Sequence, residues 1–209
     1  MAYQTGNIKY RGSFKSIRQW RVKKDKKTYA GEKGGANRDL ILNSPAFART
    51  RENMNEFAGC ATVGKSIRTG QAQLTKQMCD SQFTGRLTGI VKKINLEDQS
   101  EARGYRAILI SSVPQYLIGL NFNRNKSFEG SFSAPVETTV SAKRDSVILN
   151  IEPFNPLTQV NAPAGSTHFR FVNSISVISD YAYNSTTGIY EPIEPALNEL
   201  SKVTYSDYI

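Results

Sequence analysis

Hydrophobic and polar positions follow three different patterns along the chain. Residues 6–35 hold short strand-like stretches separated by polar residues, which predicts a β-hairpin. In residues 36–106 apolar residues recur at spacings of three, four or seven, which predicts helices. In residues 107–209 short runs rich in Val, Ile, Phe, Tyr, Ser and Thr alternate with turn signals, which predicts antiparallel strands. The expected fold is therefore α+β: a basic N-terminal β-hairpin, a short helical middle and a C-terminal antiparallel β-sandwich-like domain.

The first region carries too few apolar side chains for a core of its own. We expect strands at Ile8–Arg11, Ser16–Val22 and Lys27–Gly31, with the polar run Lys23–Lys26 as a hairpin turn. The sparse apolar residues are Phe14, Ile17, Trp20, Val22 and Tyr29. We therefore expect this hairpin arm to pack against another surface.

The helical middle predicts two main helices, preceded by a short helix at Arg38–Leu42. Asn43 or Ser44 before Pro45 is a good N-terminal signal, because proline at the first helical turn has no amide to leave unpaired. Five glycines weaken these helices by up to about 1 kcal/mol each relative to alanine. So many glycines indicate close helix packing or a break near Gly70.

The C-terminal region predicts seven short strands bounded by turn signals. They are Ala107–Val113, Tyr116–Phe122, Ser127–Ser133, Thr138–Ala142, Val147–Ile151, His168–Val177 and Ser179–Tyr183.

Positive charge is concentrated at the N-terminus. Residues 1–35 hold ten Lys/Arg and two Asp/Glu, residues 36–105 hold ten and seven, and residues 106–209 hold seven and nine. Because like charges at this density repel one another, the arm should meet an anionic partner. Its candidate partner-binding residues are Lys9, Arg11, Lys15, Arg18, Trp20, Arg21, Lys23, Lys24, Lys26, Lys27 and Lys33. Aromatic residues among these cations suit either stacking on nucleic-acid bases or burial against a neighbouring subunit.

The rest of the composition predicts a cytoplasmic protein with no membrane segment. The N-terminus has no apolar stretch of the signal-peptide kind, and no run of about 18 apolar residues occurs. Only Cys60 and Cys79 are present, which suits reduced thiols better than a disulfide framework. At 209 residues and 39% hydrophobic, the chain is long enough to bury a core, as one domain or two small ones.

Gly59–Ser66 matches the phosphate-loop pattern of two glycines followed by Lys and Ser. That loop requires a buried strand before it, whereas Arg49–Glu56 is polar and helix-patterned. No hydrophobic strand ending in Asp follows to help hold magnesium. The interpretation we favour is a helix with Lys65 and Arg68 on its solvent face.

Other catalytic patterns are also weak. His168 has Ser166 and Thr167 beside it at the start of a predicted strand, but neighbouring strand residues point to opposite faces. One histidine and two cysteines nineteen residues apart do not predict a zinc site. We interpret the acidic group Glu97, Asp98 and Glu101 as a solvated, charge-paired helix end. We therefore expect no enzyme, no cofactor, no metal and no small-molecule substrate.

Several short strings along the chain are distinctive as a set. They are Lys33–Gly35, Pro45–Asn53 with Glu56 and Phe57, Gly64–Arg68, Gly85–Thr88, Ala102–Arg106 and Ala162–Phe169. Together they resemble an uncharacterised family of small basic proteins found chiefly in Bacteroidota. The resemblance covers most of the chain and brings no catalytic residues. It implies a bacterial setting and a helix carrying Arg49, Arg51, Glu52 and Glu56 as part of the fold.

These observations predict a non-enzymatic structural or assembly protein whose basic arm docks on an anionic partner or a neighbouring subunit. Self-assembly or a larger particle is the expected context, since exposed strand edges favour strand addition. The alternative is a nucleic-acid-binding protein, for DNA or structured RNA, that uses the same arm.

Overall fold

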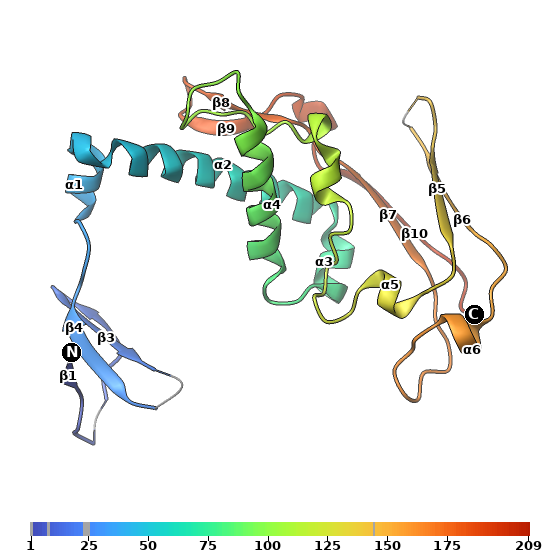
Figure 1. Ribbon diagram of the computed structural model, residues 1–209, viewed down its shortest axis with the longest axis horizontal. Helices are drawn as coiled ribbons and strands as arrows, with labels where there is room; N and C mark the ends of the chain where they lie inside the picture. Colours follow the sequence, from blue (N-terminus) through green and yellow to red (C-terminus); the bar gives the residue numbers. More distant parts are fainter. Residues whose placement is uncertain (1, 8, 23–25, 144) are drawn as a thin grey trace. The chain divides into compact units, whose positions relative to one another are not determined.

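The computed structural model describes residues 2–7, 9–22, 26–143 and 145–209 (Figure 1). The chain forms two compact units, Met1–Thr50 and Arg51–Ile209, called unit 1 and unit 2 below. The predicted α+β class is confirmed: an antiparallel sheet near the N-terminus is followed by helices and then by antiparallel strands.

Unit 1 contains a four-stranded antiparallel sheet with strand order β1-β4-β3-β2. The strands are β1 (Ala2–Tyr3), β2 (Gly12–Phe14), β3 (Ile17–Arg21) and β4 (Thr28–Glu32). The β3–β4 pair is the expected hairpin, with Trp20 directly opposite Tyr29. Most of its expected turn, residues 23–25, lies outside the described residues.

The strand predicted at Ile8–Arg11 is wrong for the described residues 9–11, which form no strand. The side chain of Gln4 explains the difference. Its Oε1 accepts from the Tyr10 N–H at 2.9 Å, and its Nε2 donates to the Tyr10 carbonyl at 3.3 Å. Backbone groups that a neighbouring strand would have paired are thus satisfied by a side chain. The strand of this region is instead β2, joined to β3 by a tight turn in which Lys15 has a φ of 50°.

The predicted helices are confirmed, including the break near Gly70. They are α1 (Arg38–Asn43), α2 (Ala48–Gly70), α3 (Ala72–Met78) and α4 (Phe83–Glu97), with the short 3-10 helix η1 (Pro45–Phe47) before α2. Asn37 caps α1, because its Oδ1 accepts from the Leu40 N–H at 2.7 Å. Ser44 precedes η1, whose first turn holds Pro45.

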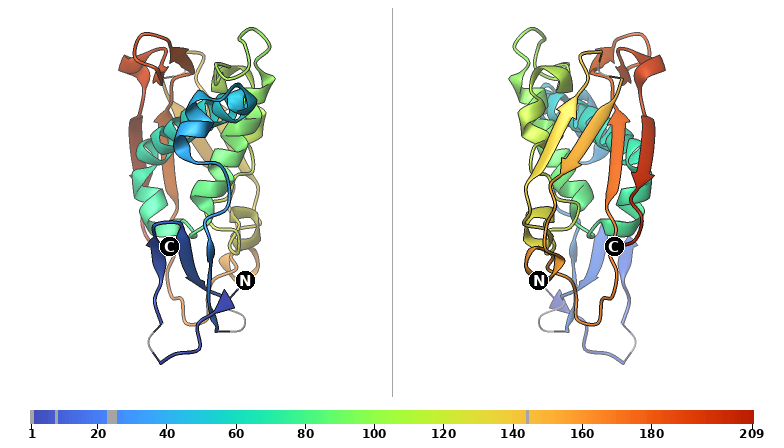
Figure 2. Two further views of the ribbon diagram at one scale, coloured as in Figure 1. Left: turned by 90° about the vertical axis from the view of Figure 1, so that its left-hand side faces the viewer. Right: turned by 90° about the vertical axis from the view of Figure 1, so that its right-hand side faces the viewer.

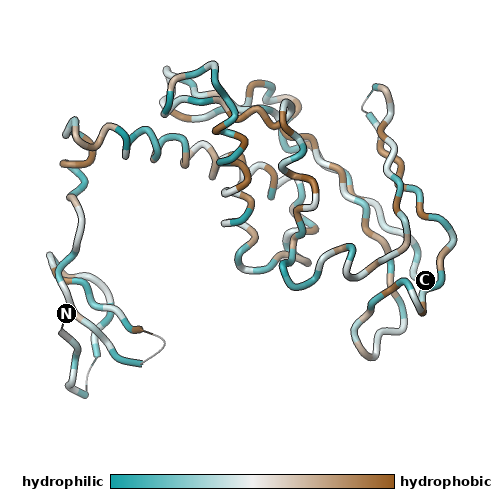
Figure 3. The backbone as a smooth tube through the Cα atoms, in the orientation of Figure 1, coloured by the Kyte–Doolittle hydropathy of each residue, from teal (hydrophilic) through white to brown (hydrophobic). Residues whose placement is uncertain are grey.

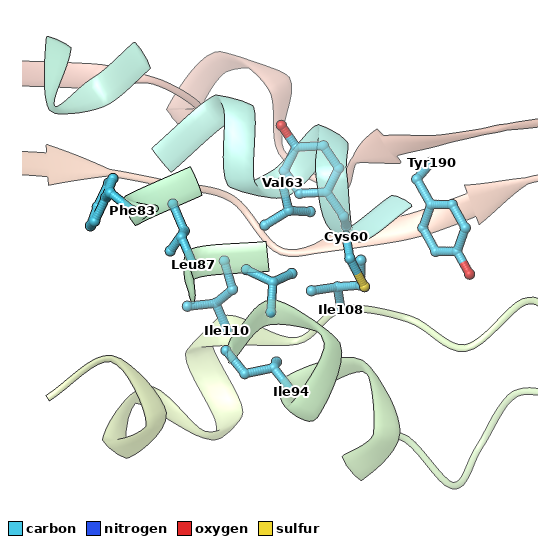
Figure 4. Close-up of a cluster of buried hydrophobic side chains, with 10 residues drawn as sticks. Cys60, Val63, Phe83, Leu87, Ile94, Ile108, Ile110 and Tyr190 are labelled. Carbon is cyan, nitrogen blue, oxygen red and sulfur yellow. The ribbon is translucent and has the colours of Figure 1, made fainter. Parts of the chain in front are cut away.

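The core of unit 2 lies between α2, α4 and two tyrosines from the C-terminal strands (Figure 4). On α4 the apolar residues fall at spacings of four and three and form a single buried face. The buried members of the core are Cys60, Val63, Phe83, Leu87, Val91, Ile94, Ile108, Ile110, Tyr181 and Tyr190. Burying each large apolar side chain of this kind stabilises the fold by roughly 1.5–3 kcal/mol.

In the described part of the C-terminal region, the strands pair two by two. The three antiparallel ribbons are β5 (Val136–Val140) with β6 (Val147–Ile151), β7 (Val172–Val177) with β10 (Leu200–Tyr205), and β8 (Tyr181–Asn184) with β9 (Ile189–Pro192). The β7–β10 ribbon runs along the end of α2 and along α3 (Figure 2). Gln71 donates to Ser176 Oγ at 2.9 Å and accepts from Ser174 Oγ at 2.5 Å, which holds the ribbon there.

Three predicted strands are wrong: Ala107–Val113, Tyr116–Phe122 and Ser127–Ser133. The chain there forms η2 (Ile110–Ser112), η3 (Pro114–Leu117) and α5 (Phe128–Ser131). Ile108 makes a single bridge to Tyr181, and its side chain enters the core without a paired strand. Pro114 begins η3, and the Ser127 side chain caps α5 by accepting from the Gly130 N–H at 3.0 Å. Local turn chemistry therefore outweighs strand propensity in this segment.

The remaining short helices are α6 (Pro156–Gln159) and η4 (Pro195–Leu197). A second apolar cluster lies near α5 and α6, made of phenylalanine rings whose centroids are 4.9 to 6.1 Å apart. Its members are Phe128, Phe132, Phe154, Phe169 and Phe171. No helix within the described ranges combines the length and apolar character needed to cross a membrane.

Candidate functional site

The net charge of the chain belongs entirely to the first unit. Residues 1–50 hold twelve Lys/Arg and three Asp/Glu, a net charge of +9, whereas residues 51–209 hold fifteen of each. The positive electrostatic potential that comes from the net charge of the chain therefore originates from unit 1.

The described candidate cations lie at the surface of unit 1. The exposed ones are Lys9, Arg11, Lys15, Arg18, Arg21, Lys26, Lys27 and Lys33. Trp20 is half-buried, and Lys23 and Lys24 lie outside the described residues. The sheet brings some of these residues together and separates others, because neighbouring residues on a strand point to opposite faces.

One face of the sheet carries three aromatic rings in a row. Tyr3 lies opposite Tyr29, which lies opposite Trp20, so the three side chains share a face across β1, β4 and β3. The ring centroids are 6.5 Å apart for Tyr3 and Tyr29 and 6.2 Å apart for Tyr29 and Trp20. The indole lies against Gly31, where an added Cβ would fall 3.3 Å from Cη2 of Trp20.

The same face also gathers cations. Arg18 lies opposite Gly31 on this side of the sheet, and the Lys27 Nζ lies 5.1 Å from the centroid of the Tyr3 ring. We call Tyr3, Arg18, Trp20, Lys27 and Tyr29 the aromatic face. Tyr3 is not among the residues predicted from the sequence, because no strand is predicted at residues 2–3, and β1 is what places Tyr3 beside Tyr29.

The opposite face of the sheet differs in composition. Arg21 and Glu32 are both on it, so its charges are mixed. Its aromatic residue, Phe14, is 71% exposed and contacts the Lys15 ammonium at 5.8 Å from the ring centroid. Among the described residues, one face of the sheet therefore combines aromatic rings with cations, and the other carries both signs of charge.

Among the described residues of unit 2, the most buried charged side chain is Glu56 of α2, which is 1% exposed. Lys92 of α4 donates to its Oε2, and the Gly104 N–H donates to its Oε1 at 2.8 Å. Lys92 also donates to Asn95 Oδ1 at 2.8 Å, and Asn95 Nδ2 donates to the Arg106 carbonyl at 2.8 Å. These bonds fix the segment after α4 against both helices.

Burial on its own raises the pKa of Glu56, but other interactions outweigh it. The hydrogen bonds from Lys92 and the Gly104 N–H, with the charges of Lys92 and Arg106, leave the pKa of Glu56 below its ordinary value. A carboxylate that is buried, ionised and hydrogen-bonded on both oxygens serves as a structural clamp rather than as an acid or base.

The acidic group near the end of α4 is partly buried, which corrects the expected solvated helix end. Asp98 is buried and accepts from the Ser100 and Ala107 N–H groups at 2.9 and 2.7 Å. Glu97 accepts from the Tyr116 hydroxyl at 2.5 Å, and Glu101 is exposed. Asp98 thus satisfies backbone donors where the chain leaves the helix.

The phosphate-loop match Gly59–Ser66 lies wholly within α2, as the helix interpretation predicted. Lys65 is exposed, but Arg68 is half-buried, so its expected place on the solvent face is wrong. Ser66 is buried and lies 2.7 Å from the Tyr181 hydroxyl, and it accepts from Asn198 Nδ2 at 3.0 Å. The hydroxyl that would bind Mg²⁺ in a phosphate loop therefore faces the protein interior.

His168 is exposed and lies outside any strand, with its Nδ1 2.9 Å from Thr167 Oγ1. In the part of the chain that the structure describes, no group of three or more His, Cys, Asp or Glu side chains is placed to hold a metal ion. Cys60 and Cys79 are free thiols.

Comparison of the chain with protein-family models, curated proteins and solved structures gives no match. The resemblance to small basic Bacteroidota proteins therefore stays a prediction.

Proposed function

We propose that this protein is a non-enzymatic structural subunit. Copies of the chain associate through the apolar strands of unit 2, and the basic unit 1 docks on an anionic partner. The observation that supports this proposal best is the apolar side of the β5–β6 ribbon. Hydrophobic positions follow both strands of that ribbon (Figure 3).

The strand register divides the ribbon into two faces. Val136 and Ile151, Thr138 and Leu149, and Val140 and Val147 are paired on one face. Val140 is 54% exposed and Leu149 37% exposed, although strands with one apolar face normally bury it. A surface of this kind favours burial against another protein chain.

The surface area of the chain supports the same conclusion. Two separate folded units of these sizes would expose about 11,300 Å² in total. The chain exposes 14972 Å². The difference, roughly 3,700 Å², exceeds the ~800 Å² that one partner buries in a standard interface. Enough surface is thus available for contacts with more than one neighbour.

The ribbon also offers edges for strand addition. Within the described residues β5 pairs with β6 and with no further strand. The outer edge of each strand therefore presents backbone donors and acceptors already aligned for another strand.

Sedimentation of nuclease-treated protein tests self-association. We expect a species larger than the monomer that dissociates when Val140→Glu and Leu149→Glu place charges on the apolar face. Asn150→Glu is the matched control, since Asn150 is exposed on the other face of β6 and its substitution should leave the size unchanged. A wild-type chain that is monomeric at every concentration contradicts the proposal.

A second candidate function is nucleic-acid binding by the same basic unit. It is favoured by the balanced charge of residues 51–209, because a second copy then offers no excess of acidic residues for unit 1 to meet. Binding through phosphates predicts an affinity that falls linearly with the logarithm of salt concentration. An affinity independent of salt contradicts it.

A further inference from the structure

We infer that the aromatic face of unit 1 binds single-stranded nucleic acid, with bases stacked on its rings and phosphates held by its cations. This inference rests on the anionic-partner half of the proposed function and does not depend on self-association.

The position of Trp20 is the first argument. The Cη2–Cζ3 edge of its indole approaches Gly31, where the missing side chain leaves room for the ring. Trp20 is half-buried, so part of the ring stays accessible. Tyr29 is inclined to it by 24°, so two nearly parallel rings lie next to each other. Flat aromatic surfaces of this type stack on bases of any sequence.

The spacing of the rings favours a single strand over a duplex. The centroids are 6.2 and 6.5 Å apart, nearly twice the ~3.4 Å between successive base pairs of a duplex. Bases within a duplex are stacked on one another, so their flat faces are not free to meet a protein ring. The Tyr3 ring is tilted by 62° to that of Tyr29, so an extended single strand can stack one base on the Trp20–Tyr29 pair and turn a neighbouring base onto Tyr3.

The charges of the face complete the site. Arg18 lies two residues before Trp20 on the same face of β3, and the Lys27 ammonium lies at the Tyr3 ring, so a cation lies near each end of the aromatic row. Among the strand residues that the structure describes, none on this face is acidic, since Glu32 lies opposite Ile17 and belongs to the other face. A phosphate backbone that follows the rings would therefore meet positive charge near each end of the row.

Trp20 is the sole tryptophan of the chain and provides the test. Its fluorescence is followed while an oligo(dT) of twelve nucleotides is added. The protein used carries Val140→Glu and Leu149→Glu, so that self-association does not contribute. We expect quenching that saturates and weakens with added salt. Heparin, a polyanion without bases, should bind without this quenching. Oligo(dT) binding without quenching, or equal quenching by heparin, overturns the inference.

Two alanine variants separate stacking from charge. Tyr3→Ala removes a ring that is 54% exposed, and Phe14→Ala removes a ring that is 71% exposed on the other face. Because stacking on one base is worth about fivefold or more in affinity, Tyr3→Ala should weaken oligo(dT) binding by at least that factor. Phe14→Ala should leave it unchanged. Equal losses in the two variants, or tighter binding to a duplex than to the single strand, overturn the inference.

Arg18→Gln tests the cation at the other end of the row. Arg18 is exposed, so this variant should keep the wild-type emission spectrum in the absence of nucleic acid. It should also lower the slope of log affinity against log salt by about one phosphate contact. An unchanged slope contradicts the proposed path of the backbone. Self-association is measured separately by sedimentation, so failure of either proposal is seen by itself.

Discussion

Gly59 of α2 lies against the ring of Tyr190 so closely that a Cβ at position 59 would fall 2.5 Å from Cδ2 of that ring. Two further atoms of the same ring would lie at 2.6 and 2.8 Å. The glycine lets β9 pack directly on the helix, and the Tyr190 hydroxyl then donates to the Arg106 carbonyl at 3.0 Å. A residue that resembles part of a phosphate loop in the sequence is thus a packing residue.

Gly59→Ala should destabilise the protein by about 1–3 kcal/mol, because the Tyr190 ring must move to admit the methyl group. Urea unfolding followed by circular dichroism measures the change. The matched control is Gly85→Ala on α4, where an added Cβ meets nothing within 4 Å. That variant should stabilise the helix by about 0.5–1 kcal/mol. The same sign in both variants contradicts the packing argument.

Glu56→Gln should destabilise unit 2 by roughly 3 kcal/mol, since it leaves the Lys92 ammonium beside a neutral amide. This value lies at the lower end of the usual cost of breaking a buried ion pair, because the Lys92 side chain is 23% exposed. Chemical denaturation at neutral pH measures this loss. Lys93→Gln, a change at the neighbouring exposed lysine, should have little effect.

The lowered pKa of Glu56 also predicts an acid-sensitive stability. A carboxyl group whose pKa is lower in the folded chain contributes its full stabilisation above the unfolded value of 4.5. That contribution is lost as the pH falls below 4.5 and through the folded pKa. The Glu56→Gln variant should therefore show a shallower loss of stability with acid than the wild type. Parallel pH profiles would show that Glu56 does not titrate in this way.

Lys65→Ala should affect neither stability nor nucleotide binding, because Lys65 is an exposed residue in the middle of a continuous helix. Equilibrium dialysis with ATP and GTP checks both the wild type and the variant. Affinity for either nucleotide that disappears with Lys65 contradicts the helix interpretation of this segment.

Removal of residues 1–35 should leave unit 2 folded, since the buried core is built from residues of α2 and beyond. The truncated chain loses ten of its cations and should lose its affinity for nucleic acid. Its self-association, measured by sedimentation, should persist. An unfolded remainder would show that the N-terminal strands belong to the core.

The helices could be predicted because their signals are local. Phe83, Leu87 and Val91 repeat at the spacing of a helix face, and Pro45 marks the start of a helical turn. The strands predicted between residues 107 and 133 were wrong because Ile108 and Ile110 are apolar for a different reason: each enters a core formed by distant elements. A single sequence indicates that such apolar residues are buried, but it does not indicate which elements they pack against.

The positive charge of the candidate site could be predicted from the sequence, but the arrangement of its side chains could not. The cations of unit 1 are visible as a sequence run, whereas the aromatic face depends on the register that pairs Tyr3 with Tyr29. A shift of one residue in β1 would turn Tyr3 to the opposite side. The same holds for Glu56, whose partner Lys92 is brought to it by helix packing.

The rate at which the Cys60 thiol is chemically modified can report how often unit 2 opens. The thiol is fully buried, and burial raises its pKa to about 12. Burial also raises the pKa of Cys79, but that residue is only half-buried. Alkylating reagents attack thiolates that they can reach, so Cys79 should be modified first. The slower modification of Cys60 then reports how often α2 and α4 separate, without any label added to the protein.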